Sequence, residues 1–212
     1  MGTKTLTGIP LQEFLDKLAE GSPAPGGGSV AALAAALACS LCAMVARLTL
    51  GRARYRDAWS DMERVRDSAD KRLRRFVELI DLDTEAYNRV IAAFRMPKET
   101  DDQVAARKEA IEAASKEAAQ APLETLRNVH KLVGLVGEVL SKGNPNCITD
   151  AGVAAQLTRA AALGAAYNVR INLSGIKDEP FSARLEKEVK ESLYAIEKSV
   201  EEFGLVVEKG FK

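Results

Sequence analysis

The strongest fold signal in this chain lies in residues 59–94, WSDMERVRDSADKRLRRFVELIDLDTEAYNRVIAAF. Its apolar residues recur at steps of three or four, the spacing that places side chains on one face of an α-helix. The members of this stripe are Trp59, Met62, Val65, Ala69, Leu73, Phe76, Ile80, Tyr87, Val90 and Phe94. The pattern predicts one long helix from about Tyr55 to Phe94, stopped by Pro97, with one face buried against other helices.

Asp83 is the one position that interrupts this stripe. A carboxylate on a buried face costs free energy unless it is paired or neutral. Burial raises the pKa of such a group, whereas a nearby cation or hydrogen-bond donor lowers it. Asp83 is therefore a candidate for proton transfer. The alternative is a polar layer, with the carboxylate bonded to a Thr or Tyr of a neighbouring helix. Asp81 lies off the stripe, and we expect it to be solvated.

The rest of the chain also has helical spacing, and no segment alternates as a strand does. Helices are expected at 10–20, 30–50, 101–142, 149–173 and from Pro180 onward, with Pro122 kinking or splitting the third. Ser29 is the expected N-cap of the second, and Thr149 or Asp150 that of the fourth. The fold class is thus all-α, an antiparallel bundle of five or six helices, two of them long, in a single domain over residues 1–212. Exposed apolar positions favour a homodimer or a dimer of dimers.

The charge balance argues against two classes of partner. The chain has 30 Lys and Arg against 30 Asp and Glu, which gives no electrostatic case for nucleic acid or an anionic membrane. The uncharged segment Val30–Ala46 is rich in Ala and shorter than the roughly 20 strongly apolar residues that a membrane span requires. It is better explained as a core helix with small residues on all sides. No secretory signal precedes it, so we expect a cytoplasmic protein with reduced thiols.

The Cys and His content predicts no metal site. Cys39 and Cys42 lie three apart, but there is no second pair and only one histidine, His130, to complete four ligands. The two cysteines are expected to be small core residues. His130 is expected to be a packed or half-exposed helix residue.

Two loop regions are candidate binding sites. Pro23–Ser29 (PAPGGGS) contains three glycines that let a backbone approach closely and leave helix N-terminal amides open to an anion. The alternative is a tight connection between two packed helices. Asn146, Thr149 and Asp150 lie at a helix start, where plain capping is the simpler explanation. The polar residues at 168, 170 and 172 cannot share one helical face, so at least one should be buried or at an interface.

Four segments together resemble one family, the formiminotetrahydrofolate cyclodeaminase and methenyltetrahydrofolate cyclohydrolase family. They are PAPGGGSVAALAAALACSLCAMVARLT (23–49), DTEAYNRVIAAFRMPKET (83–100), NPNCITDAGVAA (144–155) and AALGAAYNVRINL (161–173). The resemblance implies a helical bundle that dimerises. It also implies a tetrahydrofolate substrate, with or without a polyglutamate tail, and no cofactor beyond that substrate. The first expectation is a cyclodeaminase that releases ammonia from 5-formiminotetrahydrofolate, and the second is a cyclohydrolase that opens 5,10-methenyltetrahydrofolate. A non-catalytic folate-binding or assembly module is the remaining alternative.

The resemblance also assigns roles to residues. Asp83 matches the acidic residue expected to act as general acid and base, and Lys98 matches a segment that binds substrate or steadies charge. The substrate-binding positions implied are Gly26, Gly27, Gly28, Ser29, Tyr87, Asn146 and Asp150. Both subfamilies carry these motifs, so they do not decide between the two reactions.

Overall fold

The structure, a computed structural model, describes residues 5–211 and is built from helices. The α-helices are α1 (Leu11–Ala19), α2 (Gly27–Thr49), α3 (Trp59–Phe94), α4 (Asp101–Lys142), α5 (Ile148–Leu173) and α6 (Glu179–Lys209). Short 3-10 turns lie at Leu6–Gly8, Ala53–Ala58 and Pro145–Cys147. No strand occurs within residues 5–211. The all-α prediction with two long helices is confirmed, although α3 begins at Trp59, after a 3-10 turn, rather than at Tyr55.

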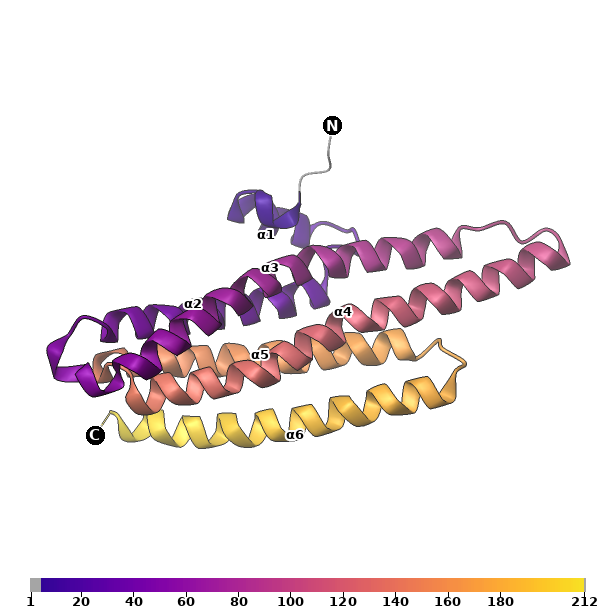
Figure 1. The fold of residues 1–212 in the computed structure, drawn as a ribbon. Coiled ribbons are helices and arrows are strands. Elements are labelled where there is room, and N and C mark those ends of the chain that lie inside the picture. The colour runs from indigo at the N-terminus through magenta and orange to yellow at the C-terminus, as the bar shows by residue number, and fades with distance from the viewer. Residues whose placement is uncertain (1–4, 212) are drawn as a thin grey trace.

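Helices α2 to α6 run antiparallel to one another in chain order (Figure 1). Helix α2 packs against α3 and α5, α4 packs against α3 and α5, and α6 covers α4 and α5. The ends of α3 and α4 that join each other extend beyond the rest of the bundle as a two-helix arm (Figure 1), and the 3-10 turn Leu6–Gly8, which precedes α1, packs against α3. The bundle therefore has two ends: one holds the start of α2 and the end of α5, and the other holds the end of α2 and the start of α5.

Small residues let α2 pack closely against α3 and α5. Its alanines at 32, 35, 38 and 46 are buried, as are Cys39 and Cys42. A Cβ placed on Gly164 of α5 would lie 3.0 Å from the Ala31 Cβ of α2, so the two backbones approach closely. By length and composition α2 could cross a membrane, but 61% of its apolar window is buried inside the bundle. This burial favours the predicted core helix.

Two predicted helix caps are wrong. Helix α2 begins at Gly27 with Gly26 as N-cap, so Ser29 lies inside its first turn and its hydroxyl bonds to α3 instead. Helix α5 begins at Ile148, directly after a 3-10 turn whose cap is the Asn144 side chain. That turn already leads the chain into the helix, so Thr149 and Asp150 fall in the first turn and do not cap it.

Pro122 does not split α4, which is continuous from Asp101 to Lys142. A proline inside a helix has no N–H, so the carbonyl four residues earlier loses its donor. That carbonyl belongs to Ala118, and it accepts a hydrogen bond of 3.0 Å from the side-chain amide of Asn172 on α5. The helix tolerates the proline because a neighbouring helix supplies the missing donor.

Candidate functional site

A cavity of about 250 Å³ lies where the start of α2 meets α3, α4 and α5. Its walls are the glycine loop, the C-terminal part of α3 and the last turns of α5. The lining residues are Pro23, Ala24, Gly26, Gly27, Gly28, Asp83, Tyr87, Ala118, Asn168, Ile171 and Asn172. Segments far apart in the sequence therefore meet at one small concave surface.

Asp83 is the acidic residue of this cavity. Its Oδ2 lies 3.1 Å from the Ser29 hydroxyl oxygen, within hydrogen-bond distance. Burial raises the pKa of Asp83 above its ordinary 3.8, and hydrogen bonds from the side chain and backbone of Ser29 offset part of that rise. A carboxyl with this environment exchanges its proton closer to neutral pH than a surface aspartate does.

Ser29 can serve either protonation state of Asp83. Its Oγ lies 3.0 Å from the Ile80 carbonyl oxygen and 3.3 Å from the Thr84 hydroxyl. The single hydroxyl proton cannot be donated to Ile80 and to Asp83 at once. When Asp83 is ionised, Ser29 can donate to it; when Asp83 is protonated, it can donate to Ser29, which then donates to Ile80. Each state therefore has a hydrogen-bond partner.

Two glycines of the loop leave no room for a side chain beside the cavity. A Cβ on Gly28 would lie 2.0 Å from Asp83 Oδ1 and 2.6 Å from Oδ2. A Cβ on Gly27 would lie 3.2 Å from the Asn168 side-chain nitrogen, a milder but still tight contact. The absence of a side chain at Gly28 lets the first turn of α2 lie directly on the Asp83 carboxylate, and its absence at Gly27 leaves room for Asn168.

Two asparagines of α5 complete the cavity, and sequence reasoning did not assign them a role there. Asn168 donates to the Gly164 carbonyl at 2.8 Å, and Asn172 donates to Ala118 and to Asn168. Within residues 5–211 neither side-chain oxygen accepts a hydrogen bond, so both remain available as acceptors. Their spacing of four places them on one face, whereas Arg170 points to Glu186 of α6. That spacing was the signal in the sequence.

The profile of the family described as Formiminotransferase-cyclodeaminase matches residues 10–191 of this chain. The match includes the glycine loop, α3, α4, α5 and the first part of α6.

The chain belongs to the formiminotransferase-cyclodeaminase family.

Relatives of known name agree with this assignment. A methenyltetrahydrofolate cyclohydrolase of Methylorubrum extorquens is 37% identical over 84% of this chain and 86% of its own length. The formimidoyltransferase-cyclodeaminase of Rattus norvegicus is 32% identical over 85% of this chain but only 34% of its own length. The crystal structure of a formiminotetrahydrofolate cyclodeaminase from Thermotoga maritima has a TM-score of 0.85 at 30% identity, covering 95% of this chain and 96% of that one. The prediction that the chain is an enzyme of one of these two types is confirmed.

Most of the site residues predicted for this family meet at the cavity. Gly26, Gly27, Gly28, Asp83 and Tyr87 line it, and Ser29 contacts it through Asp83.

Three other predicted residues lie elsewhere. Lys98 is exposed in the loop at the tip of the α3–α4 arm, beyond Phe94, which is roughly 16 Å along the helix from Asp83. Asn146 and Asp150 lie at the opposite end of the bundle, with Asp150 about 27 Å along α5 from Asn168. Within one chain the structure does not bring these three side chains to the cavity.

The cysteines and the histidine take no part in the cavity. Cys39, Cys42 and Cys147 are free and buried, and burial raises the pKa of Cys39 to about 12. The prediction of small core residues at 39 and 42 is confirmed. His130 is exposed on α4. No group of His, Cys, Asp and Glu suited to a metal ion occurs in the part of the chain that the structure describes.

Asp81 differs from expectation. It accepts hydrogen bonds from the Leu6 backbone N–H and the Thr7 hydroxyl, at 2.6 and 3.0 Å. It is half-buried rather than solvated because the 3-10 turn before α1 lies over it, and its role is to attach that segment to α3.

Proposed function

We propose that this protein is a formiminotetrahydrofolate cyclodeaminase in which Asp83 carries the proton. The observation that carries the proposal is a half-buried carboxyl of raised pKa, in contact with the glycine loop and open to a cavity. The family assignment supplies the substrate class, a tetrahydrofolate with a one-carbon unit on N5. General acid–base catalysis by one such side chain accounts for about 10²- to 10⁴-fold in rate.

The reaction requires one proton to change place. N10 attacks the formimino carbon, which becomes tetrahedral, bonded to N5, N10, an amino group and hydrogen. N10 then loses its proton, the amino group gains one, the carbon–amino bond breaks and ammonia leaves. The product is 5,10-methenyltetrahydrofolate. Asp83 is proposed to accept the N10 proton and to donate to the leaving nitrogen, and Ser29 stabilises it in both states.

The cavity is proposed to hold only the reacting part of the substrate. Its volume of about 250 Å³ is below the roughly 300–1,000 Å³ of pockets for drug-sized ligands. The free side-chain oxygens of Asn168 and Asn172 are suited to accept hydrogen bonds from the pterin ring, and Tyr87 supplies an aromatic face. The remainder of the folate would lie outside the cavity.

A second candidate is methenyltetrahydrofolate cyclohydrolase. The observation that favours it is the 37% identity to the Methylorubrum extorquens enzyme of that name over most of both chains. In this reaction water attacks the methenyl carbon and loses one proton to Asp83. The bond from carbon to N5 then breaks, and N5 receives the hydroxyl proton. The products are 10-formyltetrahydrofolate and one released proton.

An absorbance assay with both substrates separates the candidates. The methenyl compound absorbs in the near ultraviolet, and its open forms do not. Growth of absorbance from 5-formiminotetrahydrofolate, with stoichiometric ammonia, supports the cyclodeaminase. Decay of absorbance from 5,10-methenyltetrahydrofolate above the spontaneous rate supports the cyclohydrolase. If neither substrate reacts faster than without protein, both proposals fail, and a non-catalytic folate-binding module becomes the better explanation.

We also propose a homodimer, or a dimer of dimers, that uses the outer face of α2 and α5. Large apolar side chains are exposed along this face, namely Val30, Leu37 and Leu48 of α2 and Val153, Tyr167 and Ile171 of α5. Ile171 also lines the Asp83 cavity, so this face adjoins the site. Sedimentation velocity tests the proposal: a single species of monomer mass at assay concentration would contradict it.

The remaining assignments stay proposals. Lys98 is proposed to bind substrate or to steady charge, and Asn146 and Asp150 are proposed to bind substrate, although one chain holds all three away from the Asp83 cavity. Alanine variants that keep full activity would remove each from the site. No cofactor beyond the folate substrate is proposed, because proton transfer and carbon–nitrogen bond changes need no electron transfer. The cytoplasmic location remains a prediction.

A further inference from the structure

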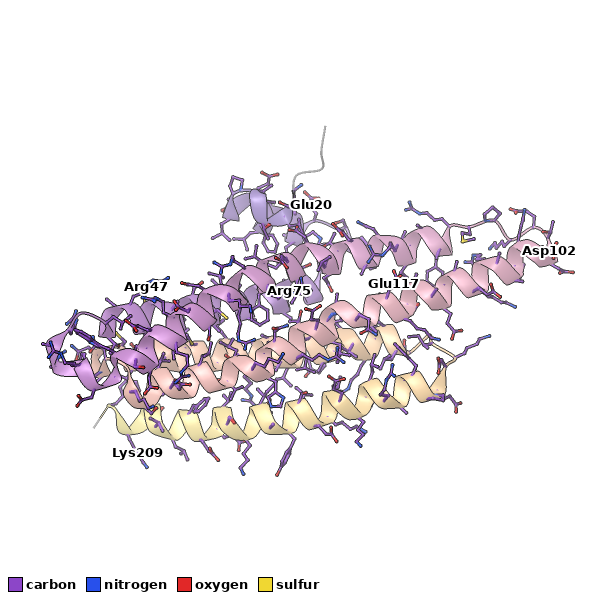
Figure 2. All side chains as sticks on the ribbon, in the orientation of Figure 1. Glu20, Arg47, Arg75, Asp102, Glu117 and Lys209 are labelled. Atoms are coloured by element: carbon purple, nitrogen blue, oxygen red, sulfur yellow. The ribbon has the colours of Figure 1, made fainter. Side chains whose placement is uncertain are left out.

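A second concave surface lies between the middle of α3 and α4, away from the Asp83 cavity. It is a groove of about 780 Å³, lined by Ser68, Lys71, Arg72, Arg74, Arg75, Glu78, Glu124, Asn128 and Lys131. Figure 2 labels Arg75 midway along α3, where α3 and α4 lie side by side. We call these nine residues the basic groove.

Both carboxylates of the basic groove are hydrogen-bonded to one arginine, Arg75. Arg75 binds Glu124 through two hydrogen bonds of 2.7 Å, and its Nη1 binds Glu78. Hydrogen bonds from Arg75 hold the pKa of Glu124 below its usual range, so this carboxylate stays ionised and paired. Neither carboxylate neutralises the other four cations, and within residues 5–211 those four make no ion pair.

The unpaired cations are crowded. Lys71 lies three residues before Arg74, a spacing at which like charges on a helix repel. Arg72 is held at its far end by the Asn128 side-chain oxygen, 3.3 Å from Nη1. Its Nε is buried and, among the described residues, has no hydrogen-bond acceptor. A buried donor without a partner costs free energy.

The basic groove is separate from the Asp83 cavity. The two surfaces share no lining residue. Arg75 and Asp83 are eight residues apart on α3, or about 12 Å along the helix. On α4 the groove uses Glu124 to Lys131, whereas the cavity uses Ala118. A ligand of the groove therefore need not contact the reacting carbon.

We propose that the basic groove binds an oligoanion with two or more closely spaced phosphate or carboxylate groups. Five cationic side chains against two already paired carboxylates leave a surplus of positive charge along one groove. Arginine forks match the geometry of both kinds of anionic group. A volume of about 780 Å³ is larger than one phosphate needs, which favours several linked groups over a single ion. This proposal does not depend on which folate reaction the enzyme performs.

Calorimetric titration at low ionic strength tests the proposal on the full chain. The probes are inorganic triphosphate, tri-γ-glutamate and orthophosphate. We expect triphosphate or triglutamate to bind more tightly than orthophosphate, and the affinity to fall as salt is added. The tighter of the two identifies the kind of group. Equal affinity for orthophosphate and the two oligoanions, or no binding of either oligoanion, would overturn the proposal.

A charge-matched pair of variants locates the site. The double variant Lys71→Gln, Lys131→Gln removes two exposed groove cations, whereas Lys187→Gln, Lys198→Gln removes two exposed cations from α6. The groove variant should raise the Kd by at least about tenfold, since each hydrogen bond to a charged group is worth roughly that factor. The α6 variant should stay within about twofold of wild type. Equal losses in both variants would show a general charge effect and no site.

Discussion

Replacement of Gly28 by alanine tests the contact between the glycine loop and Asp83. The added Cβ would lie 2.0 Å from Asp83 Oδ1, about 1.4 Å short of the 3.4 Å at which ordinary contact begins. The carboxyl and the first turn of α2 must therefore separate by more than an ångström. A displacement of about 1 Å can cost roughly 100-fold in rate. We expect the Gly28→Ala variant to lose at least about 100-fold in kcat/KM.

The same substitution should change stability only modestly. Overpacking in a packed interior costs about 1–3 kcal/mol. Alanine in place of glycine in a helix returns about 0.5–1 kcal/mol. The net loss of unfolding free energy should then lie between about 0 and 2.5 kcal/mol, which leaves the protein folded in the assay. Urea denaturation followed by circular dichroism measures it.

Two further glycine variants calibrate the result. Gly134 is exposed on α4 with nothing within 4 Å of its added Cβ, so Gly134→Ala should keep full activity and gain about 0.5–1 kcal/mol. Gly27→Ala, with its Cβ 3.2 Å from Asn168, should fall between the two in rate. A folded Gly28→Ala protein with the rate of Gly134→Ala would show that activity does not depend on the room that Gly28 leaves for the carboxyl.

Three more predictions follow from the hydrogen bonds around the cavity. Ser29→Ala removes a donor to Asp83, so the pKa of Asp83 should rise further, and the pH–rate profile should shift to higher pH. Because the pKa of Asp83 in the folded protein lies above the usual 3.8, the folded state binds this proton more tightly than the unfolded state does. The unfolding free energy of the wild type, relative to that of Asp83→Asn, should therefore fall as the pH rises from 3.8 through the raised pKa. Urea titration of both proteins at several pH values measures this difference. Asn172→Ala leaves the Ala118 carbonyl without its donor and should cost about 1–3 kcal/mol in the same titration. Adding Pro122→Ala restores the helix N–H, so the double variant should recover much of that loss; strict additivity would argue against the compensation.

The helices could be predicted because their apolar spacing is a local property of the sequence. The stripe on α3 also identified Asp83, since a lone carboxylate among buried positions is visible without a structure. The helix starts could not be predicted as well. Gly28 lies against Asp83 of α3 and Gly27 against Asn168 of α5, and contacts across 55 and 141 residues leave no local signal at the start of α2.

The cavity walls show the same limit. Asn168 and Asn172 carried a signal in their spacing of four, but which helix they face depends on the packing of α5 against α4. The hydrogen bond from Asn172 to the Ala118 carbonyl, which Pro122 leaves without a helical donor, depends on tertiary structure because the two residues are 54 positions apart. Lys98, Asn146 and Asp150 came from the family resemblance alone, and the single chain holds them far from Asp83.

The most direct test of the central claim is the rate of Asp83→Asn with both folate substrates, beside Asp67→Asn as a matched change on the exposed face of α3. Asparagine keeps the size of the side chain but cannot carry the proton. We expect a loss of at least about 100-fold in kcat/KM for Asp83→Asn, and no loss for Asp67→Asn. Both proteins should remain folded by circular dichroism. A folded Asp83→Asn protein that turns over substrate at the wild-type rate would show that Asp83 does not carry the proton.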